Sequence, residues 1–183
     1  SEPVPELGSL RRRHQSLTDA ALQPGVFCSL GIHGSQLEIV AEFEPAAVGT
    51  VGLAVRVSPD GEEETLITYN FADDQLEIDC RRSSLDLTTN RPLVGGPLRL
   101  PRGAPVRLHV FLDASVIEIF ANGRAVAARV YPTLPESHGI RAFNRPPTPY
   151  ESLAVAPTQY LRRVDVWELE SIWDGTERIP SDA

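Results

Sequence analysis

Two carboxylates, Asp113 and Glu118, lie on either side of the short segment Ala114-Ser115 and are spaced closely enough to act together. Paired carboxylates that flank a bound sugar perform the acid/base and nucleophilic steps of glycoside hydrolysis. In an antiparallel hairpin, however, Asp113 would end one strand while Glu118 would lie inside the next strand. This geometry argues against a catalytic pair and leaves both residues as candidates for binding.

Glu118 is expected to share a strand face with Phe120, whereas Ile117 and Ile119 point to the opposite face. Apolar residues on both faces predict a strand that is buried on both sides or covered by another domain, where a carboxylate needs a partner. Glu118 is then either structural and paired with an arginine, or in contact with a neighbouring domain, or part of a sugar site. Asp113 is more simply a turn residue whose side chain accepts hydrogen bonds from nearby backbone N–H groups.

The residue types that bind metals are too scattered to form a site. No histidine lies at ligand spacing from another histidine or from a cysteine, and the four are His14, His33, His109 and His138. The sequence therefore predicts no metal site and no cofactor. Cys28 and Cys80 are either two buried free thiols or one disulfide between strands, and a disulfide would imply secretion.

Aromatic side chains are the usual platforms for sugar rings, and five are candidates here: Phe143, Tyr131, Tyr150, Trp167 and Trp173. Trp167 lies in an apolar strand and is expected in the core. The proline-rich segment Arg145–Tyr150 is the most plausible exposed feature, which makes Tyr150 a candidate for binding. The same segment would otherwise close the domain against a neighbour.

The elements that must position these side chains are short strands. Sixteen prolines and thirteen glycines divide the chain, and apolar residues alternate with a period of two. Asn122-Gly123 predicts a tight hairpin turn. About ten strands at short spacing predict an all-β fold, a lectin-like or jelly-roll-like sandwich of two antiparallel sheets. The expected strands are Leu37–Phe43, Val51–Val57, Thr65–Phe71, Gln75–Cys80, Val106–Asp113, Val116–Ala121, Ala125–Tyr131, Gly139–Ala142, Ser152–Ala156 and Tyr160–Leu169.

The 183 residues suit one domain, and their net charge of −8 argues against nucleic acid or an anionic membrane as a partner. Residues 1–17 contain Pro3 and Pro5 and predict a linker that enters a short helix or turn. The sandwich is expected over 18–173, followed by a flexible polar tail over 174–183. Because the sequence contains no methionine, we expect Ser1 to be a cut end, and this leaves the cellular location open.

The run 112–123, which reads Leu-Asp-Ala-Ser-Val-Ile-Glu-Ile-Phe-Ala-Asn-Gly, resembles a hallmark segment of the C-terminal sandwich of glycoside hydrolase family 32. Arg129-Val130-Tyr131-Pro132 also resembles that family. The apolar strand Val164–Trp173 is similar to its C-terminal end, and Pro3–Arg11 is similar to the connector that leaves its catalytic domain. These matches follow one another in the family's order along the chain.

The resemblance implies a parent enzyme of the invertase, levanase or β-fructofuranosidase type. Such enzymes join an N-terminal five-bladed propeller to this sandwich and act on the β-fructofuranosyl units of sucrose, inulin or levan. Their two catalytic carboxylates belong to the propeller and work with retention of configuration. The family's Trp-x-Asn-Asp-Pro-Asn-Gly, Arg-Asp-Pro and Glu-Cys motifs are absent here. No catalytic residue is carried over, and we expect the chain to be inactive alone.

Two classes of function follow for the sandwich. It is either a structural accessory domain that packs on the propeller, with a homo-oligomer as a further option, or a module that binds levan or inulin. An unrelated lectin-like sandwich is the third reading. Substrate preference, and the choice between hydrolysis and transfer, are not encoded in this segment.

Overall fold

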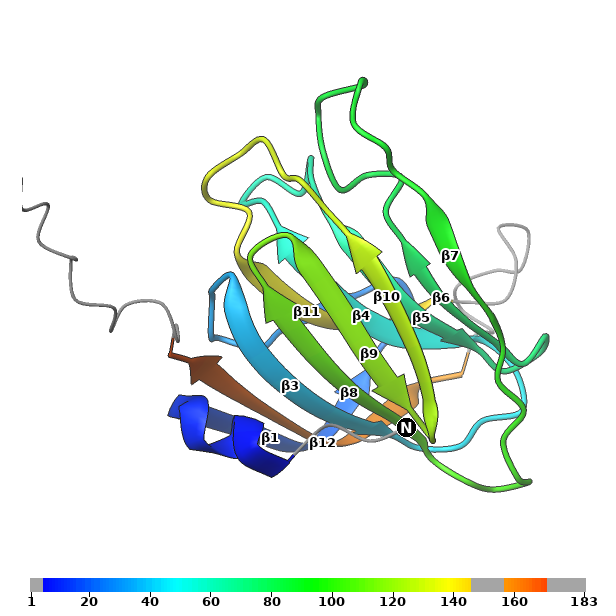
Figure 1. The fold of residues 1–183 in the computed structure, drawn as a ribbon. Helices are drawn as coiled ribbons and strands as arrows, with labels where there is room; N and C mark the ends of the chain where they lie inside the picture. Colours follow the sequence, from blue (N-terminus) through cyan, green and yellow to red (C-terminus); the bar gives the residue numbers. More distant parts are fainter. Residues whose placement is uncertain (1–4, 146–156, 171–183) are drawn as a thin grey trace, which may run out of the picture.

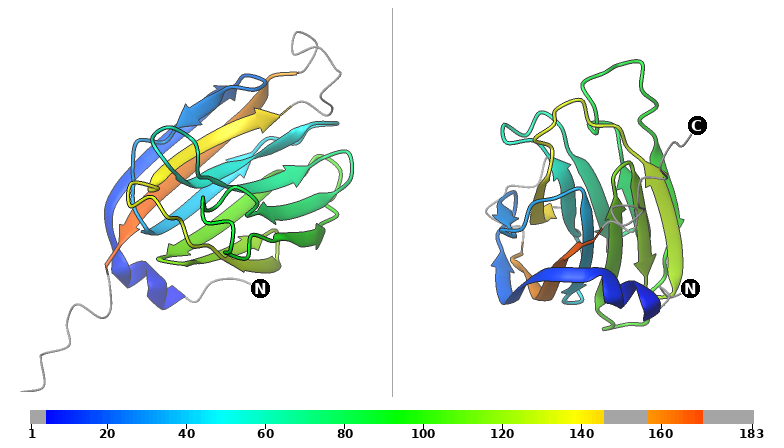
Figure 2. Two further views of the ribbon diagram at one scale, coloured as in Figure 1. Left: turned by 90° about the horizontal axis from the view of Figure 1, so that it is seen from above. Right: turned by 60° about the vertical axis from the view of Figure 1, so that its left-hand side comes forward.

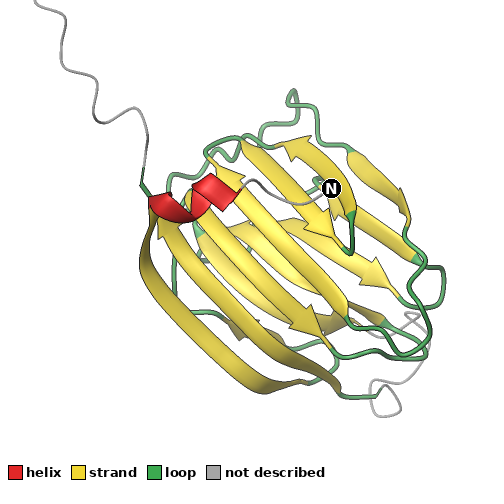
Figure 3. Cartoon of the chain, turned by 60° about the horizontal axis from the view of Figure 1, so that its bottom comes forward, coloured by secondary structure: helices red, strands yellow, loops and turns green. Residues whose placement is uncertain are grey.

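Two six-stranded antiparallel sheets pack face to face in the computed structural model, which describes residues 5–145 and 157–170 (Figures 1 and 2). The short 3-10 helix η1 (Pro5–Leu10) lies across one end of the strands (Figure 3). In spatial order the first sheet contains β1 (Arg11–Leu22), β12 (Gln159–Leu169), β3 (Gln36–Phe43), β8 (Val106–Asp113), β9 (Val116–Ala121) and β10 (Arg124–Arg129). The second contains β2 (Phe27–Ser29), β11 (Gly139–Arg145), β4 (Thr50–Val57), β5 (Thr65–Asn70), β6 (Gln75–Asp79) and β7 (Leu93–Pro97).

The predicted all-β sandwich is confirmed, and most of the expected strands are present within a residue or two of their predicted ends. Strand Ser152–Ala156, Trp173 and the tail 174–183 lie outside the described residues. The sequence pattern missed β1, β2 and β7. Each of these is largely exposed, so none shows the buried alternation on which the prediction depends.

The prediction that residues 1–17 form a linker is wrong for residues 11–17, which belong to a strand of the sandwich. Residues 5–10 form the expected helical turn, but strand β1 begins at Arg11 and pairs with β12 as far as Leu22. Backbone hydrogen bonds hold β1 at the edge of the sheet, although most of its side chains are exposed. Whether the preceding residues lead out of a propeller stays a prediction.

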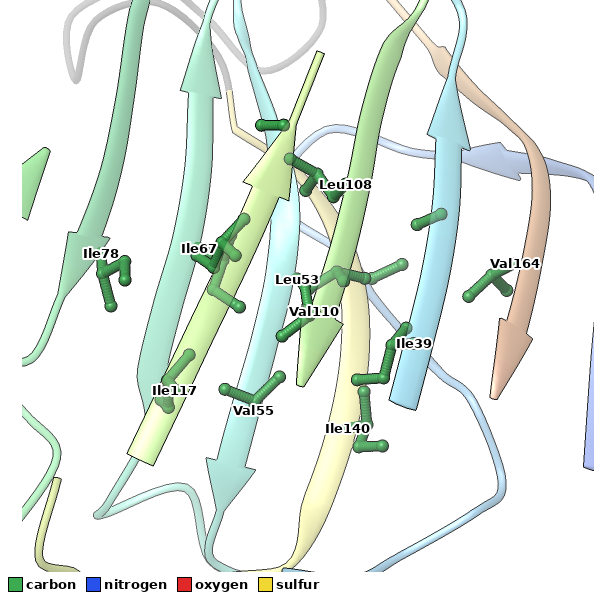
Figure 4. Packing of buried hydrophobic residues seen from close by; sticks show 14 of the residues in the cluster. Ile39, Leu53, Val55, Ile67, Ile78, Leu108, Val110, Ile117, Ile140 and Val164 are labelled. Atoms are coloured by element: carbon green, nitrogen blue, oxygen red, sulfur yellow. The ribbon is translucent and has the colours of Figure 1, made fainter. Parts of the chain in front are cut away.

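The core is the layer between the two sheets, filled by the alternate, inward side chains of every central strand. Ile39 and Val110 from the first sheet meet Leu53 and Ile140 from the second, as Figure 4 shows. All four side chains are almost completely buried. This layer fixes which residues of each strand point outward, and therefore which can contact a partner.

The hairpin between β9 and β10 turns where the sequence predicts it. Asn122 and Gly123 have φ angles of 44° and 89°, as expected for a two-residue turn with both residues in the left-handed region. The Asn122 side chain accepts a hydrogen bond from the Arg107 N–H at 2.9 Å and donates one to the Pro105 carbonyl at 3.1 Å. The turn is thereby tied to the start of β8.

Glu63, in the loop between β4 and β5, is a fully buried carboxylate that organises one end of the sandwich. It accepts hydrogen bonds from the backbone N–H of Leu85, from both the N–H and the hydroxyl of Thr133, and from the N–H of Leu134. The Ser137 hydroxyl donates a fifth at 2.7 Å. Burial alone would raise the pKa of Glu63, but these donors outweigh it and lower the pKa to about 2.

Both cysteines are free thiols, so a disulfide between them is excluded. Cys80 is buried, and this burial raises the pKa of its thiol to about 11, whereas Cys28 is half-buried. Among the described residues, no helix has the length and apolar character needed to cross a bilayer.

We predict that Glu63→Gln lowers the free energy of unfolding at pH 7 by about 3 kcal/mol, because an amide leaves several buried donors without an acceptor. The pKa of Glu63 is lowered from 4.5 to about 2 on folding, so its contribution is complete above pH 4.5 and is lost as the pH falls toward 2. Denaturant unfolding at pH 7 and pH 3 measures both effects. The exposed neighbour Glu62→Gln is the control, and equal stability of the two variants at pH 7 would contradict the role of Glu63.

Candidate functional site

The outer face of the first sheet combines aromatic and charged side chains in two rows that cross all six strands. The strand register defines the rows, because residues paired across strands point the same way. We call this surface the aromatic–ionic face. One row is His14, Trp167, Glu38, Phe111, Glu118 and Ala127, and the other is Ser16, Asp165, Val40, His109, Phe120 and Ala125.

Glu38, at the centre of the aromatic–ionic face, is the anchor of its charged part. Its carboxylate is only 1% exposed, and it accepts two hydrogen bonds from Arg11, from Nε at 2.7 Å and Nη2 at 2.6 Å. His109 Nε2 lies 2.6 Å from the same carboxylate. Burial opposes ionisation, but the hydrogen bonds from Arg11 and His109 together lower the pKa of Glu38. The network joins β1, β3 and β8.

Asp165 on β12 forms a second charged group on this face. Arg163 donates to it through Nε at 2.5 Å and Nη2 at 3.0 Å, and His14 Nε2 lies 2.8 Å away. The bonds from Arg163, assisted by His14 and Ser16, lower the pKa of Asp165 to about 2. Both buried carboxylates of the face are therefore ionised and paired at neutral pH.

Trp167 lies on the aromatic–ionic face, so the expectation that it belongs to the core is wrong. Strand alternation turns Val164 and Val166 inward and leaves Trp167 outward and half-buried. The ring of His14 stacks on it with centroids 4.7 Å apart, and the guanidinium carbon of Arg11 lies 4.1 Å from its centroid. The indole is held in place by these neighbours while part of its surface remains open.

Phe111 and Phe120 form the aromatic centre of the face, on β8 and β9. Their rings pack edge to face at 6.3 Å, and His109 stacks on Phe111 at 4.8 Å. Phe120 is half-buried, and Val116 at the start of β9 is 38% exposed. The outer side of β9 is therefore open, which excludes burial on both sides within this chain. The alternative expectation, that another domain covers this side, stays a prediction.

The sequence-predicted binding candidates are not brought together by the structure. Asp113 accepts a hydrogen bond from Gln36 Nε2 at 3.2 Å, a side-chain partner in place of the expected backbone donors. Glu118 is exposed between Phe111 and Ala127 and, within the described part of the chain, makes neither a hydrogen bond nor an ion pair. The arginine expected to pair with it is thus not found there. Tyr150 lies outside the described residues.

Sequence reasoning missed Arg11, His14, Glu38 and Asp165, which carry the charged part of the face. Glu38 interrupts an apolar strand and could have been noticed on that ground, but its partner Arg11 is 27 residues away on a strand that was not predicted. Within residues 5–145 and 157–170, no group of three or more His, Cys, Asp or Glu side chains could hold a metal ion.

The fold and this face define a two-sheet antiparallel β-sandwich domain. The family model described as "Glycosyl hydrolases family 32 C terminal" matches residues 6–159. The chain therefore belongs to the family of C-terminal domains of glycoside hydrolase family 32, as the resemblance of its hairpin implied.

Several relatives of established name match this chain over part of their length. It is 27% identical over 172 residues to an acid β-fructofuranosidase of Vicia faba, covering 72% of this chain and 26% of the relative. It is 26% identical over 130 residues to an extracellular exo-inulinase of Aspergillus awamori, covering 68% of this chain and 22% of the relative. The chain thus spans about a quarter of the length of these relatives.

Solved structures show the same fold. Fructan 1-exohydrolase IIa from Cichorium intybus superposes with a TM-score of 0.79 at 20% identity, over 92% of this chain and 37% of that protein. A fructosyltransferase from A. japonicus gives a TM-score of 0.75 at 22% identity, over 93% of this chain and 28% of that protein.

We predict that Phe120→Ala and Ile119→Ala differ sharply in stability although the residues are neighbours. Ile119 is fully buried between the sheets, so its truncation should cost about 2–5 kcal/mol. Phe120 loses only its contacts with Phe111 and His109 on the outer face, which corresponds to about 1 kcal/mol. Denaturant unfolding of this chain measures both values. A larger loss for Phe120→Ala would contradict the assignment of the two faces.

Proposed function

We propose that this chain is the accessory sandwich of a β-fructofuranosidase-type glycoside hydrolase, and that its aromatic–ionic face packs on the catalytic propeller of the same protein. The observation that carries the proposal is the open outer face of the first sheet, in a domain that spans about a quarter of its curated relatives. The parent would release fructose from β-fructofuranosyl substrates, with its catalytic carboxylates on the propeller. The sandwich would stabilise that propeller.

The composition of the face supports a protein partner. Interfaces are enriched in aromatic residues and arginine at their centre, and Trp, Tyr and Arg supply most of the binding energy. Trp167, Phe111 and Phe120 provide such anchors here, with Arg11 beside them. The carboxylates of Glu38 and Asp165 already have partners within the domain, so a second domain can cover them without leaving a buried charge unpaired.

The opposite outer face, on the second sheet, is less suited to this role. Ala54, Leu66 and Phe143 are already buried there, in a cluster separate from the main core. Phe27 is 42% exposed, and the guanidinium of Arg141 lies 5.8 Å from its ring centroid. The first sheet therefore carries more aromatic side chains that remain partly uncovered.

The proposal is tested by comparing the parent enzyme with this chain alone. The double variant Phe120→Ser/Trp167→Ser should lower the stability of the isolated chain modestly. In the full-length parent enzyme the same variant should accelerate thermal inactivation about tenfold more than its effect on the isolated chain accounts for. The reason is that two anchors of the interface between the domains are lost as well. The turnover of sucrose at 25 °C should stay unchanged, since the chemistry lies in the propeller. Phe27→Ser is the control on the second sheet.

Three results would contradict the proposal. One is an equal loss of stability in both contexts, and another is a larger effect of Phe27→Ser in the parent. The third is a gene without a propeller ahead of this domain. Calorimetric titration of the isolated chain with levan, inulin and fructose separates the accessory role from that of a fructan-binding module. We expect no heat of binding.

A further inference from the structure

Arg56 occupies an irregular position in the second sheet. It lies on β4 with a φ angle of 52°, a left-handed conformation that is rare for a long side chain. The register between β11 and β4 passes from Gly139–Val57 to Arg141–Ala54, so Val55 and Arg56 together face the single residue Ile140. Such a bulge redirects a side chain that regular pairing would point elsewhere.

Arg56 as a whole is half-buried, but two nitrogens of its guanidinium lie buried without a partner. Its Nε and Nη1 atoms are inaccessible to solvent and make no hydrogen bond within the described residues. The nearby carboxylate of Glu63 attracts the guanidinium through space, but it is engaged by five donors from other residues. Burial lowers the pKa of Arg56, yet an arginine stays charged in proteins. Buried N–H donors without an acceptor are costly, so these two nitrogens call for a nearby oxygen acceptor.

Arg56 lines an open surface pocket of about 450 Å³ at one end of the sandwich. The wall comes from the loop between β2 and β3, the turn between β8 and β9, and the loop between β10 and β11. Hydroxyl-bearing side chains and one imidazole face it, namely Ser35, Ser115, Tyr131 and His138. Within the described part of the chain, no carboxylate lines this pocket. The pocket therefore offers a positive charge and hydrogen-bond donors but no anion.

We propose that this pocket binds a small oxyanion, the carboxylate or phosphate group of a small molecule, which pairs with the guanidinium of Arg56. Arginine presents a planar fork of N–H groups that matches two oxygens of a carboxylate or phosphate. A small shift of the Arg56 side chain toward the pocket would bring its buried Nε or Nη1 to the ligand. The neighbouring hydroxyls of Ser35, Ser115 and Tyr131 would donate to the remaining oxygens. Glu63 supports the site by holding Thr133 and Leu134, which form part of its wall.

His138 gives the site a dependence on pH. Its pKa is lowered by burial and by the positive charge of Arg56, while Glu136 opposes this effect and His33 adds to it. A bound oxyanion would offset the charge of Arg56 and favour protonation of His138. The affinity for sulfate, whose own charge is constant over this range, should therefore rise as the pH falls from about 8 to about 5.5.

Titration of the 183-residue chain with sulfate, inorganic phosphate and malonate, followed by calorimetry, tests the proposal. We expect one site for the oxyanions and none for fructose as a neutral probe. Tighter binding of malonate would identify a carboxylate ligand, and tighter binding of phosphate a phosphorylated one. Arg56→Met should weaken binding at least about tenfold, as expected for loss of a charge-assisted bond. Arg102→Met, which removes an exposed arginine elsewhere, should leave binding unchanged.

Stability measurements keep the test independent of folding defects. Because Arg56→Met removes two buried N–H groups that have no acceptor, it should leave the thermal midpoint unchanged or raise it. Sulfate should raise the thermal midpoint of the unsubstituted 183-residue chain but not that of the Arg56→Met variant. Should Arg56→Met fail to fold, Arg56→Lys provides the second test. It keeps the charge but loses the planar fork, and it should bind the oxyanions more weakly than the unsubstituted chain does. Equal affinity of the unsubstituted chain and the Arg56 variant for the oxyanions would overturn the proposal. So would the absence of binding for all three oxyanions.

Discussion

The layer of side chains between the two sheets holds this domain together, and every outward feature follows from it. Once Ile39 and Val110 of the first sheet pack against Leu53 and Ile140 of the second, strand alternation fixes the direction of each neighbouring residue. Burial of such a layer is the main favourable term in folding. Inward residues are set by this packing, and outward residues are left free to differ in chemistry.

On the first sheet this freedom produces a face that is both charged and aromatic. The carboxylate of Glu38 ties the edge strand β1 to the centre of the sheet through Arg11, and the same arginine packs on Trp167. The charges are paired within the domain while the rings remain partly open. A surface built in this way can be covered by a partner at low electrostatic cost, which links the stability of the sandwich to its proposed role on a propeller.

Much of the fold could be predicted from the sequence because the central strands alternate strictly. Val106–Asp113, Val116–Ala121 and the Asn122-Gly123 turn have the predicted bounds. Strand β1 was missed since its polar sequence, Arg-Arg-Arg-His-Gln-Ser, carries no apolar period and is ordered by pairing with β12. Trp167 was misplaced because a tryptophan in an apolar strand is usually a core residue, whereas alternation with the inward Val164 and Val166 points it outward. Arg56 was not recognised, since a bulge and buried donors without an acceptor leave no trace in composition.

The most direct test of docking through the aromatic–ionic face is hydroxyl-radical footprinting with mass spectrometry. It is applied to the full-length parent enzyme and to this chain alone. Oxidation of Trp167, Phe120 and Val116 should be several-fold slower in the parent than in the isolated chain, while Phe27 on the second sheet should react equally in both. Equal oxidation of the three first-sheet residues in both samples, together with protection of Phe27, would contradict the account.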